Sequence, residues 1–205
     1  MTFGGTIVAV AGKDFIVIGA TRGASLGGML MLSRKGLKRV YKLYDRVLIG
    51  YAGLYGSFQH INGILETHLK AEYFKYKIVP SVKRIANTLS TILYSDRFYF
   101  PNPIEAIVGG FNPDGSGPEL YVVGGLGEII KEQYAAAGDG FEIALAVLES
   151  GYKQDISLEE AKELAYKALK TAAVRVLTNE PYLEPDIEFI ERPKEREYFS
   201  LGLYS

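Results

Sequence analysis

The sequence contains no cysteine, and this absence excludes disulfide-stapled scaffolds, thiolate metal sites and thiol nucleophiles together. A surplus of basic residues is also missing. The 23 lysines and arginines are balanced by 24 aspartates and glutamates, which gives a formal net charge of −1. Proteins that track nucleic-acid phosphates normally carry a basic excess, so we expect no nucleic-acid partner.

Long apolar runs are absent as well. No run approaches the roughly 20 residues that a membrane-spanning helix needs. The first five residues contain neither a basic region nor a long apolar region, so they do not resemble a secretory signal. We therefore expect no membrane partner and a cytoplasmic location.

What the chain does contain is enough apolar material for a full core. Hydrophobic residues make up 48% of the 205 residues and charged residues 23%, a composition typical of globular proteins. No internal repeat, low-complexity tract or linker divides the chain. We predict a single domain over residues 1–205, with an extended C-terminal tail over residues 193–205.

Apolar runs and turn residues predict strands, two helices, strands, two helices and a last strand. Strands are expected at residues 6–10, 15–20, 40–44, 47–51, 104–108, 120–123, 128–131 and 187–190. Helical spacing predicts helices around residues 58–69, 82–93, 141–148 and 157–177. The strand runs alternate little, which is typical of strands covered on both faces. Because strands and helices alternate in blocks, we predict an α+β fold with antiparallel sheets covered by helix layers.

Neither the histidines nor the glycine pairs predict a ligand site. His60 and His68 are eight residues apart. That is about 12 Å along a helix, too far for the two rings to share an ion without other ligands. The glycine pairs at residues 27–28, 109–110 and 124–125 lack the Lys-Ser/Thr of a phosphate-binding loop, and turns explain them. We expect no metal and no cofactor.

Several stretches together resemble one family. The opening reads Gly-Gly-Thr-Ile-Val-Ala-Val-Ala-Gly-Lys-Asp and continues as Phe-Ile-Val-Ile-Gly-Ala-Thr-Arg-Gly-Ala-Ser-Leu-Gly. Lys-Arg-Val-Tyr-Lys-Leu follows at residues 38–43, Tyr-Ala-Gly at 51–53 and Ala-Ala-Gly-Asp-Gly at 136–140. Over nearly its whole length the chain resembles the β-type subunits of the proteasome, in the N-terminal-nucleophile hydrolase superfamily. The α-type subunits carry an extra N-terminal helix, whereas this chain starts directly with its strand. The resemblance implies a four-layer αββα sandwich.

The resemblance also implies a catalytic pattern. In active members a threonine, exposed by self-cleavage after a glycine, attacks the scissile carbonyl, and its own free amine accepts the proton. A lysine and an acidic residue support that amine, and a backbone amide serves as oxyanion donor. A serine and an Asp-x-x-Ser pair complete the network.

This chain departs from the pattern when it is aligned on Lys13 and Asp14. Unsuitable residues stand at five functional positions: Gly5 at the nucleophile, Thr21 at the acid, Arg39 at the lysine, Asp139 at the serine, and Val176 with Asn179 at the Asp-x-x-Ser pair. Only Gly53, whose amide would be the oxyanion donor, is kept. Arginine is a poor replacement for lysine because its charge is spread over a larger, planar group.

The resemblance therefore implies a non-catalytic β-type subunit of the 20S proteasome, of archaeal type, with no catalytic residue of its own. Its expected partners are proteasome α subunits and catalytic β subunits in a heptameric ring. Through the complex it would support ATP-dependent degradation of unfolded polypeptides. Tyr51 stands where the family has its pocket selector.

Two alternatives stay open. In the first, the chain is an active threonine endopeptidase that is self-processed between Gly5 and Thr6, with Thr6 as nucleophile and Lys38 as the lysine; Thr21 still cannot act as the acid. In the second, it is a free-standing regulator that docks on α-rings through its ending Leu203-Tyr204-Ser205.

Overall fold

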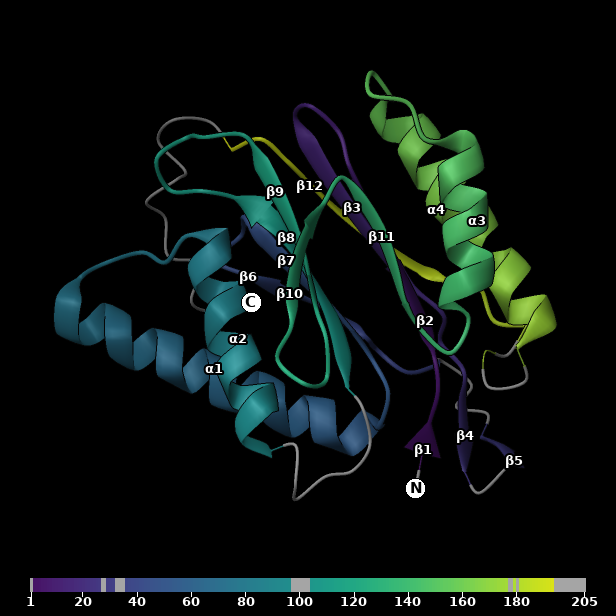
Figure 1. Ribbon diagram of the computed structural model, residues 1–205, viewed down its shortest axis with the longest axis horizontal. Helices are drawn as coiled ribbons and strands as arrows, with labels where there is room; N and C mark the ends of the chain where they lie inside the picture. The colour runs from purple at the N-terminus through teal and green to yellow at the C-terminus, as the bar shows by residue number, and fades with distance from the viewer. Residues whose placement is uncertain are drawn as a thin grey trace.

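The computed structural model describes residues 2–26, 29–31, 36–96, 104–176, 179 and 181–193. Figure 1 shows their arrangement in four layers, with two sheets packed face to face and a pair of helices outside each sheet. The predicted α+β class and the αββα sandwich are confirmed.

All strand pairs in the sheets are antiparallel. The four-stranded sheet has the order β11 (Tyr134–Gly138), β2 (Thr6–Ala11), β3 (Phe15–Ala20) and β12 (Asp186–Glu191). The five-stranded sheet has the order β10 (Ile129–Glu132), β9 (Pro118–Val123), β8 (Glu105–Phe111), β7 (Val47–Ala52) and β6 (Val40–Leu43). A small third sheet consists of β1 (Thr2–Phe3), β4 (Ala24–Leu26) and β5 (Met29–Met31).

Four helices form the outer layers of the described chain. Helices α1 (Tyr55–Tyr76) and α2 (Val82–Asp96) cover the five-stranded sheet, and α3 (Phe141–Gly151) and α4 (Leu158–Arg175) cover the four-stranded sheet. The predicted start of α4 is confirmed, because the Ser157 hydroxyl accepts from the Glu160 amide and the Glu160 carboxylate accepts from the Ser157 amide.

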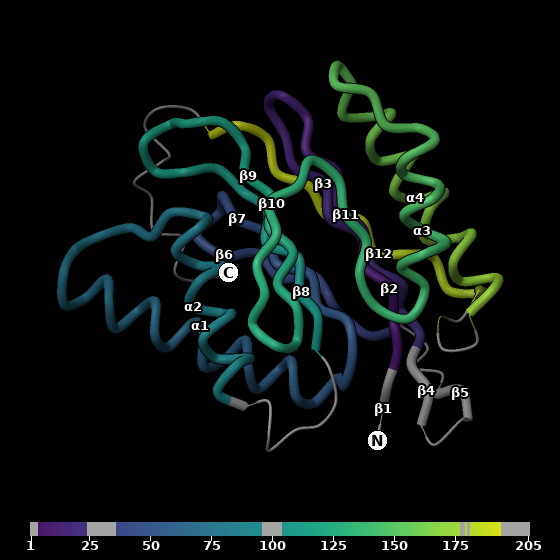
Figure 2. Tube along the Cα trace, viewed as in Figure 1, coloured from purple at the N-terminus to yellow at the C-terminus, as the bar shows by residue number. Residues whose placement is uncertain are grey.

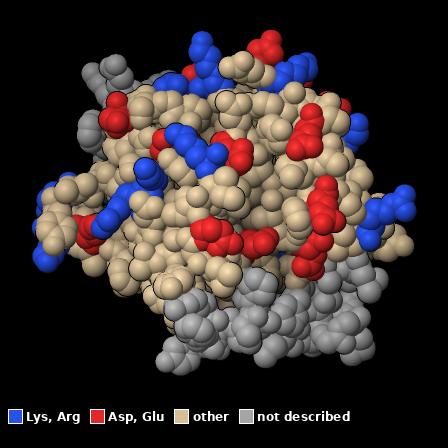
Figure 3. Space-filling model, viewed as in Figure 1, with Lys and Arg blue, Asp and Glu red and all other residues tan. Residues whose placement is uncertain are grey.

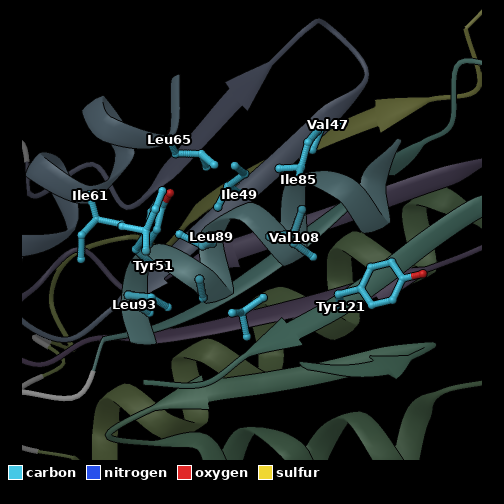
Figure 4. Close-up of a cluster of buried hydrophobic side chains, with 14 of the residues drawn as sticks. Val47, Ile49, Tyr51, Ile61, Leu65, Ile85, Leu89, Leu93, Val108 and Tyr121 are labelled. Carbon is cyan, nitrogen blue, oxygen red and sulfur yellow. The ribbon is translucent and has the colours of Figure 1, made fainter. Parts of the chain in front are cut away.

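The core consists of three apolar clusters, one beneath each helix pair and one between the sheets. Strands β2, β3 and β7 are buried along their whole length, as their continuous apolar sequences predict. Figure 4 shows the cluster beneath α1 and α2, where Leu65 and Leu89 reach down toward Ile49 and Val108 of the sheet.

Strand β11 was not predicted from the sequence. Its middle residues are alanines, which lack the branched side chains that mark strands. Ala135 and Ala137 belong to the cluster between the sheets, and Ala136 packs against the cluster beneath α3 and α4. The small side chains therefore fit a strand that is covered closely on both faces.

The expectations on membrane spans and on the C-terminal tail can be compared with the described residues as follows. No helix among the described residues is long and apolar enough to cross a membrane. The predicted tail at residues 193–205 lies outside the described residues from 194 onward, so its place stays a prediction.

Candidate functional site

The first residues of β2 lie where two loops converge, one joining β7 to α1 and the other joining β11 to α3. The Gly53 amide donates a long hydrogen bond of 3.4 Å to the Gly4 carbonyl, and the Asp139 amide donates one of 3.1 Å to the Gly5 carbonyl. Figure 2 shows β2 beside β11, with α3 over it. The one family donor that the sequence keeps, Gly53, therefore faces the Gly4–Gly5 peptide bond.

Gly5 has no room for a side chain. A Cβ atom at this position would lie 2.5 Å from Arg39 Cζ and 2.6 Å from Arg39 Nε. The Gly5 backbone also has φ +102°, which residues with a side chain rarely adopt. At the position that corresponds to the family nucleophile, the Arg39 guanidinium fills the space of the missing side chain.

Arg39 is fully buried and incompletely paired. Its Nη2 donates to the Gly23 carbonyl at 2.9 Å, whereas Nε and Nη1 have no hydrogen-bond partner among the described residues. Its Cζ atom lies 5.6 Å from the centroid of the Phe58 ring. Burial lowers the pKa of Arg39 to about 10, although the charges of Tyr55 and Asp139 act in the opposite direction. The group is a cation at neutral pH.

Thr6 lies in different surroundings, and its polar atoms are satisfied. Its Oγ1 accepts hydrogen bonds from the Gly140 amide at 3.0 Å and from Asn179 Nδ2 at 2.6 Å. Its backbone amide donates to Thr21 Oγ1 at 2.9 Å, and Thr21 Oγ1 in turn donates to Asn179 Oδ1 at 2.9 Å. All three side chains are buried. Thr6 thus connects β2 through its backbone amide to Thr21, which follows β3, and through its hydroxyl to the start of α3 and to the segment after α4.

The alternation of β2 separates the two environments. Thr6 is on the same face of β2 as Val8, which packs beneath α3 and α4, whereas Ile7 faces the space between the sheets. Gly5 precedes the strand, and the Arg39 guanidinium lies beside it. Pairing of Thr6 with Gly138 and of Ile7 with Ala20 fixes this register. The Thr6 hydroxyl, which is bonded to Gly140 and Asn179, and the Arg39 guanidinium, which lies beside Gly5, therefore lie in different surroundings.

The remaining candidate positions do not complete a proton-transfer network. Lys38 is exposed, with its Nζ 5.7 Å from the Tyr41 ring centroid. Asp139 is exposed as well, and Val176 is the residue that ends α4.

Tyr51, at the pocket-selector position, is part of the core. Its ring is fully buried and stacks on the ring of Phe58, with 5.5 Å between the two ring centroids. Its hydroxyl donates a hydrogen bond to Asn62 Oδ1 at 3.1 Å. Burial raises the pKa of Tyr51. The tyrosine therefore acts as a packing residue here.

The residues described in the structure contain no group of three or more His, Asp or Glu side chains that could hold a metal ion. His60 and His68 lie exposed on α1. The link between Thr6, Thr21 and Asn179 was not predicted from the sequence, because it joins residues up to 173 positions apart. Hydrogen bonds between residues so far apart leave no local pattern in the sequence.

Comparison with known proteins identifies the scaffold. A family model described as "Proteasome subunit" matches residues 1–183. The chain is 39% identical over 176 residues to "Proteasome subunit beta 1" of Hyperthermus butylicus, a match that covers 84% of this chain and 82% of that protein. It is 41% identical over 172 residues to "Proteasome subunit beta 2" of Pyrobaculum aerophilum, with the same two shares covered. With "Proteasome subunit beta 2" of Thermococcus gammatolerans it shares 34% identity over 200 residues, covering 92% of this chain and 97% of that protein.

Proposed function

Since the chain belongs to the proteasome subunit family and is of the β type, we propose that it is a non-catalytic subunit of the 20S core particle. It sits in a heptameric β-ring beside catalytic β subunits and stacks on α subunits in the cytoplasm. Its contribution to the degradation of unfolded polypeptides is to close the ring and position its neighbours. The archaeal type of particle is part of the proposal.

The observation that carries the proposal is the placement of residues 5 and 6. The residue whose preceding carbonyl meets the Gly53 amide is Gly5, which has no hydroxyl. The hydroxyl of the next residue, Thr6, is turned toward Gly140 and Asn179, from which it already accepts two hydrogen bonds. A nucleophile has to face the substrate carbonyl and the oxyanion donor together.

The proton-transfer residues support the same conclusion. Thr21 carries a hydroxyl where an acid would orient a lysine. Arg39 holds its charge in a planar group that lies where a side chain at Gly5 would be, so a threonine there would require the guanidinium to move.

The active alternative requires cleavage between Gly5 and Thr6 together with a shift of one residue in β2. Such a shift would turn every side chain of β2 to the opposite face. All six residues of the strand are buried, so the exchange would disrupt both neighbouring clusters. The geometry therefore favours the non-catalytic role.

The regulator alternative depends on Leu203-Tyr204-Ser205, which lie outside the described residues. No observation on the described chain favours it, and it stays an untested prediction.

The proposal is tested by co-expressing the chain with α and catalytic β subunits and measuring cleavage of a fluorogenic peptide. We expect activity to vanish when the catalytic partner's threonine is changed to alanine, and Thr6→Ala in this chain to leave the activity per assembled particle unchanged. Activity that survives the change in the partner and is lost with Thr6→Ala would show the proposal to be wrong.

A further inference from the structure

Arg39 is a buried cation that lacks acceptors in the part of the chain that the structure describes. Two of its guanidinium nitrogens, Nε and Nη1, have no hydrogen-bond partner there, and Arg39 forms no ion pair with a described carboxylate. The other large buried cation, Arg46, donates to two backbone carbonyls. Leaving guanidinium N–H groups unpaired in the interior is costly, so a group from outside the chain is expected to accept from Arg39.

Helix α1 begins beside Arg39 without a cap. Its N-cap residue is Leu54, no side chain caps the helix, and its first turn contains no acidic residue. Phe58, in that turn, holds its ring centroid 5.6 Å from Arg39 Cζ, and Tyr55 is close enough to act on Arg39 electrostatically. Figure 1 shows the start of α1 at the end of the molecule where β1 lies. The first amides of a helix need acceptors, and the helix dipole makes this end attractive to anions.

The first turn of α1 has room for a ligand. A Cβ atom added at Gly56 would meet no other atom within 4 Å, and Gly56 is exposed. The guanidinium of Arg39, in contrast, is fully buried. A ligand that reaches both groups therefore has to be small.

The surface of the molecule gives anions little general attraction. Figure 3 shows acidic and basic side chains interspersed on the described part of the face in view. The formal net charge of the chain is −1. Nonspecific attraction of anions requires a field of one sign, so a response to a low concentration of an anion has to come from a defined site.

We propose that Arg39 and the first turn of α1 bind a small monovalent anion, such as chloride or formate. The guanidinium supplies a full positive charge and two N–H donors, and the helix end supplies backbone amides. All of these groups come from one chain, so the site goes beyond the proposed function and does not depend on assembly or on catalysis.

The experiment measures Tm of the full-length chain in sodium formate and in sodium chloride, with sodium gluconate at the same ionic strength as the reference because its anion is too large for the site. For an anion that binds with a Kd of about 10 mM, a concentration of about 100 mM should raise Tm by about 4 °C. Arg39→Met should reduce this rise to less than about 1 °C. The matched control is Arg46→Met, which removes a second buried guanidinium and should keep the full rise on a lower starting Tm.

A second pair of variants tests the helix end without removing a buried group. Gly56→Asp places a carboxylate in the first turn of α1, whereas Gly56→Asn is its neutral control. In gluconate, Gly56→Asp should melt about 2 °C higher than Gly56→Asn because the carboxylate interacts with the helix dipole. Since that carboxylate competes with the bound anion, Gly56→Asp should show half or less of the formate response of Gly56→Asn.

Three results would overturn the proposal. Equal Tm values of the wild type in formate, chloride and gluconate would show that water, and not an anion, accepts from Arg39. A rise in Arg39→Met as large as in wild type would place any bound anion elsewhere. Equal responses of Gly56→Asp and Gly56→Asn would exclude the start of α1 from the site.

Discussion

Gly5 and Thr6 are adjacent in the chain, yet the polar groups around them are satisfied very differently. On the Thr6 face, the hydroxyls of Thr6 and Thr21 and the amide of Asn179 form a closed set of hydrogen bonds. On the Gly5 side, Arg39 Nε and Nη1 have no hydrogen-bond partner in the part of the chain that the structure describes. The difference indicates that the hydroxyl nearest the family's nucleophile position stabilises the fold, while the nucleophile's own space holds a poorly compensated cation.

The largest expected effect comes from adding a side chain on the Gly5 side. Gly5→Thr introduces a branched residue at positive φ and a clash with Arg39, so the free energy of unfolding should fall by about 4 kcal/mol. Chemical denaturation measures the loss. Gly5→Thr should gain no peptide cleavage. Adding Arg39→Ala should recover the part of the loss that comes from the clash. Wild-type stability in Gly5→Thr alone would contradict the geometry of this side.

A comparison of two buried arginines tests whether the charge of the guanidinium beside Gly5 is poorly compensated by hydrogen bonds. Arg46 donates to the Phe111 carbonyl at 2.6 Å and to the Pro80 carbonyl at 2.5 Å, whereas Arg39 donates only to the Gly23 carbonyl among the described residues. Arg46→Met leaves two buried carbonyls unpaired and should lower the free energy of unfolding by about 3 kcal/mol. Arg39→Met should change it by about 1 kcal/mol or less. Urea titrations of both variants measure the difference, and the reverse order would contradict the comparison.

On the Thr6 face, Thr6→Val keeps the shape of the side chain and removes its hydroxyl. The Gly140 amide and Asn179 Nδ2 then lose their acceptor, so the free energy of unfolding should fall by about 2 kcal/mol. Asn179→Ala should cost a similar amount, and the double variant should cost less than the sum because both residues act in one network. If thermal denaturation shows that the loss in the double variant equals the sum of the two single losses, the network does not act as a unit.

The smallest effect on stability is expected for an ion pair near the surface, and it provides a reference for the effects at the buried groups. Burial raises the pKa of the Glu119 carboxyl, but hydrogen bonds from Lys131 and Asn112 outweigh it and lower the pKa below 4.5. A lowered pKa in the folded state stabilises the protein above the unfolded-state pKa, and this contribution is lost as the pH falls through the folded-state value. Glu119→Gln should therefore lower Tm by about 2 °C at pH 7, and the difference from wild type should shrink below pH 4. An equal difference at both pH values would contradict this assignment.

The main elements follow from the sequence because their apolar residues recur at strand or helix spacing. The buried strands β2, β3 and β7 read as continuous apolar runs, and Ser157 with Glu160 marks the start of α4. Strand β11 escaped prediction because alanine carries little strand preference. At the site, the alignment singled out Gly5 and Arg39, which lie side by side in the structure. Their close approach depends on tertiary packing between two residues that are 34 positions apart, and no local sequence pattern predicts such packing.

Intact-mass spectrometry of the chain, taken from a reconstituted particle that cleaves peptides, tests the central claim most directly. The account predicts a mass that includes Gly5 and the residues before it, in every particle. A mass reduced by the first five residues, with Thr6 at the new N-terminus, would contradict it.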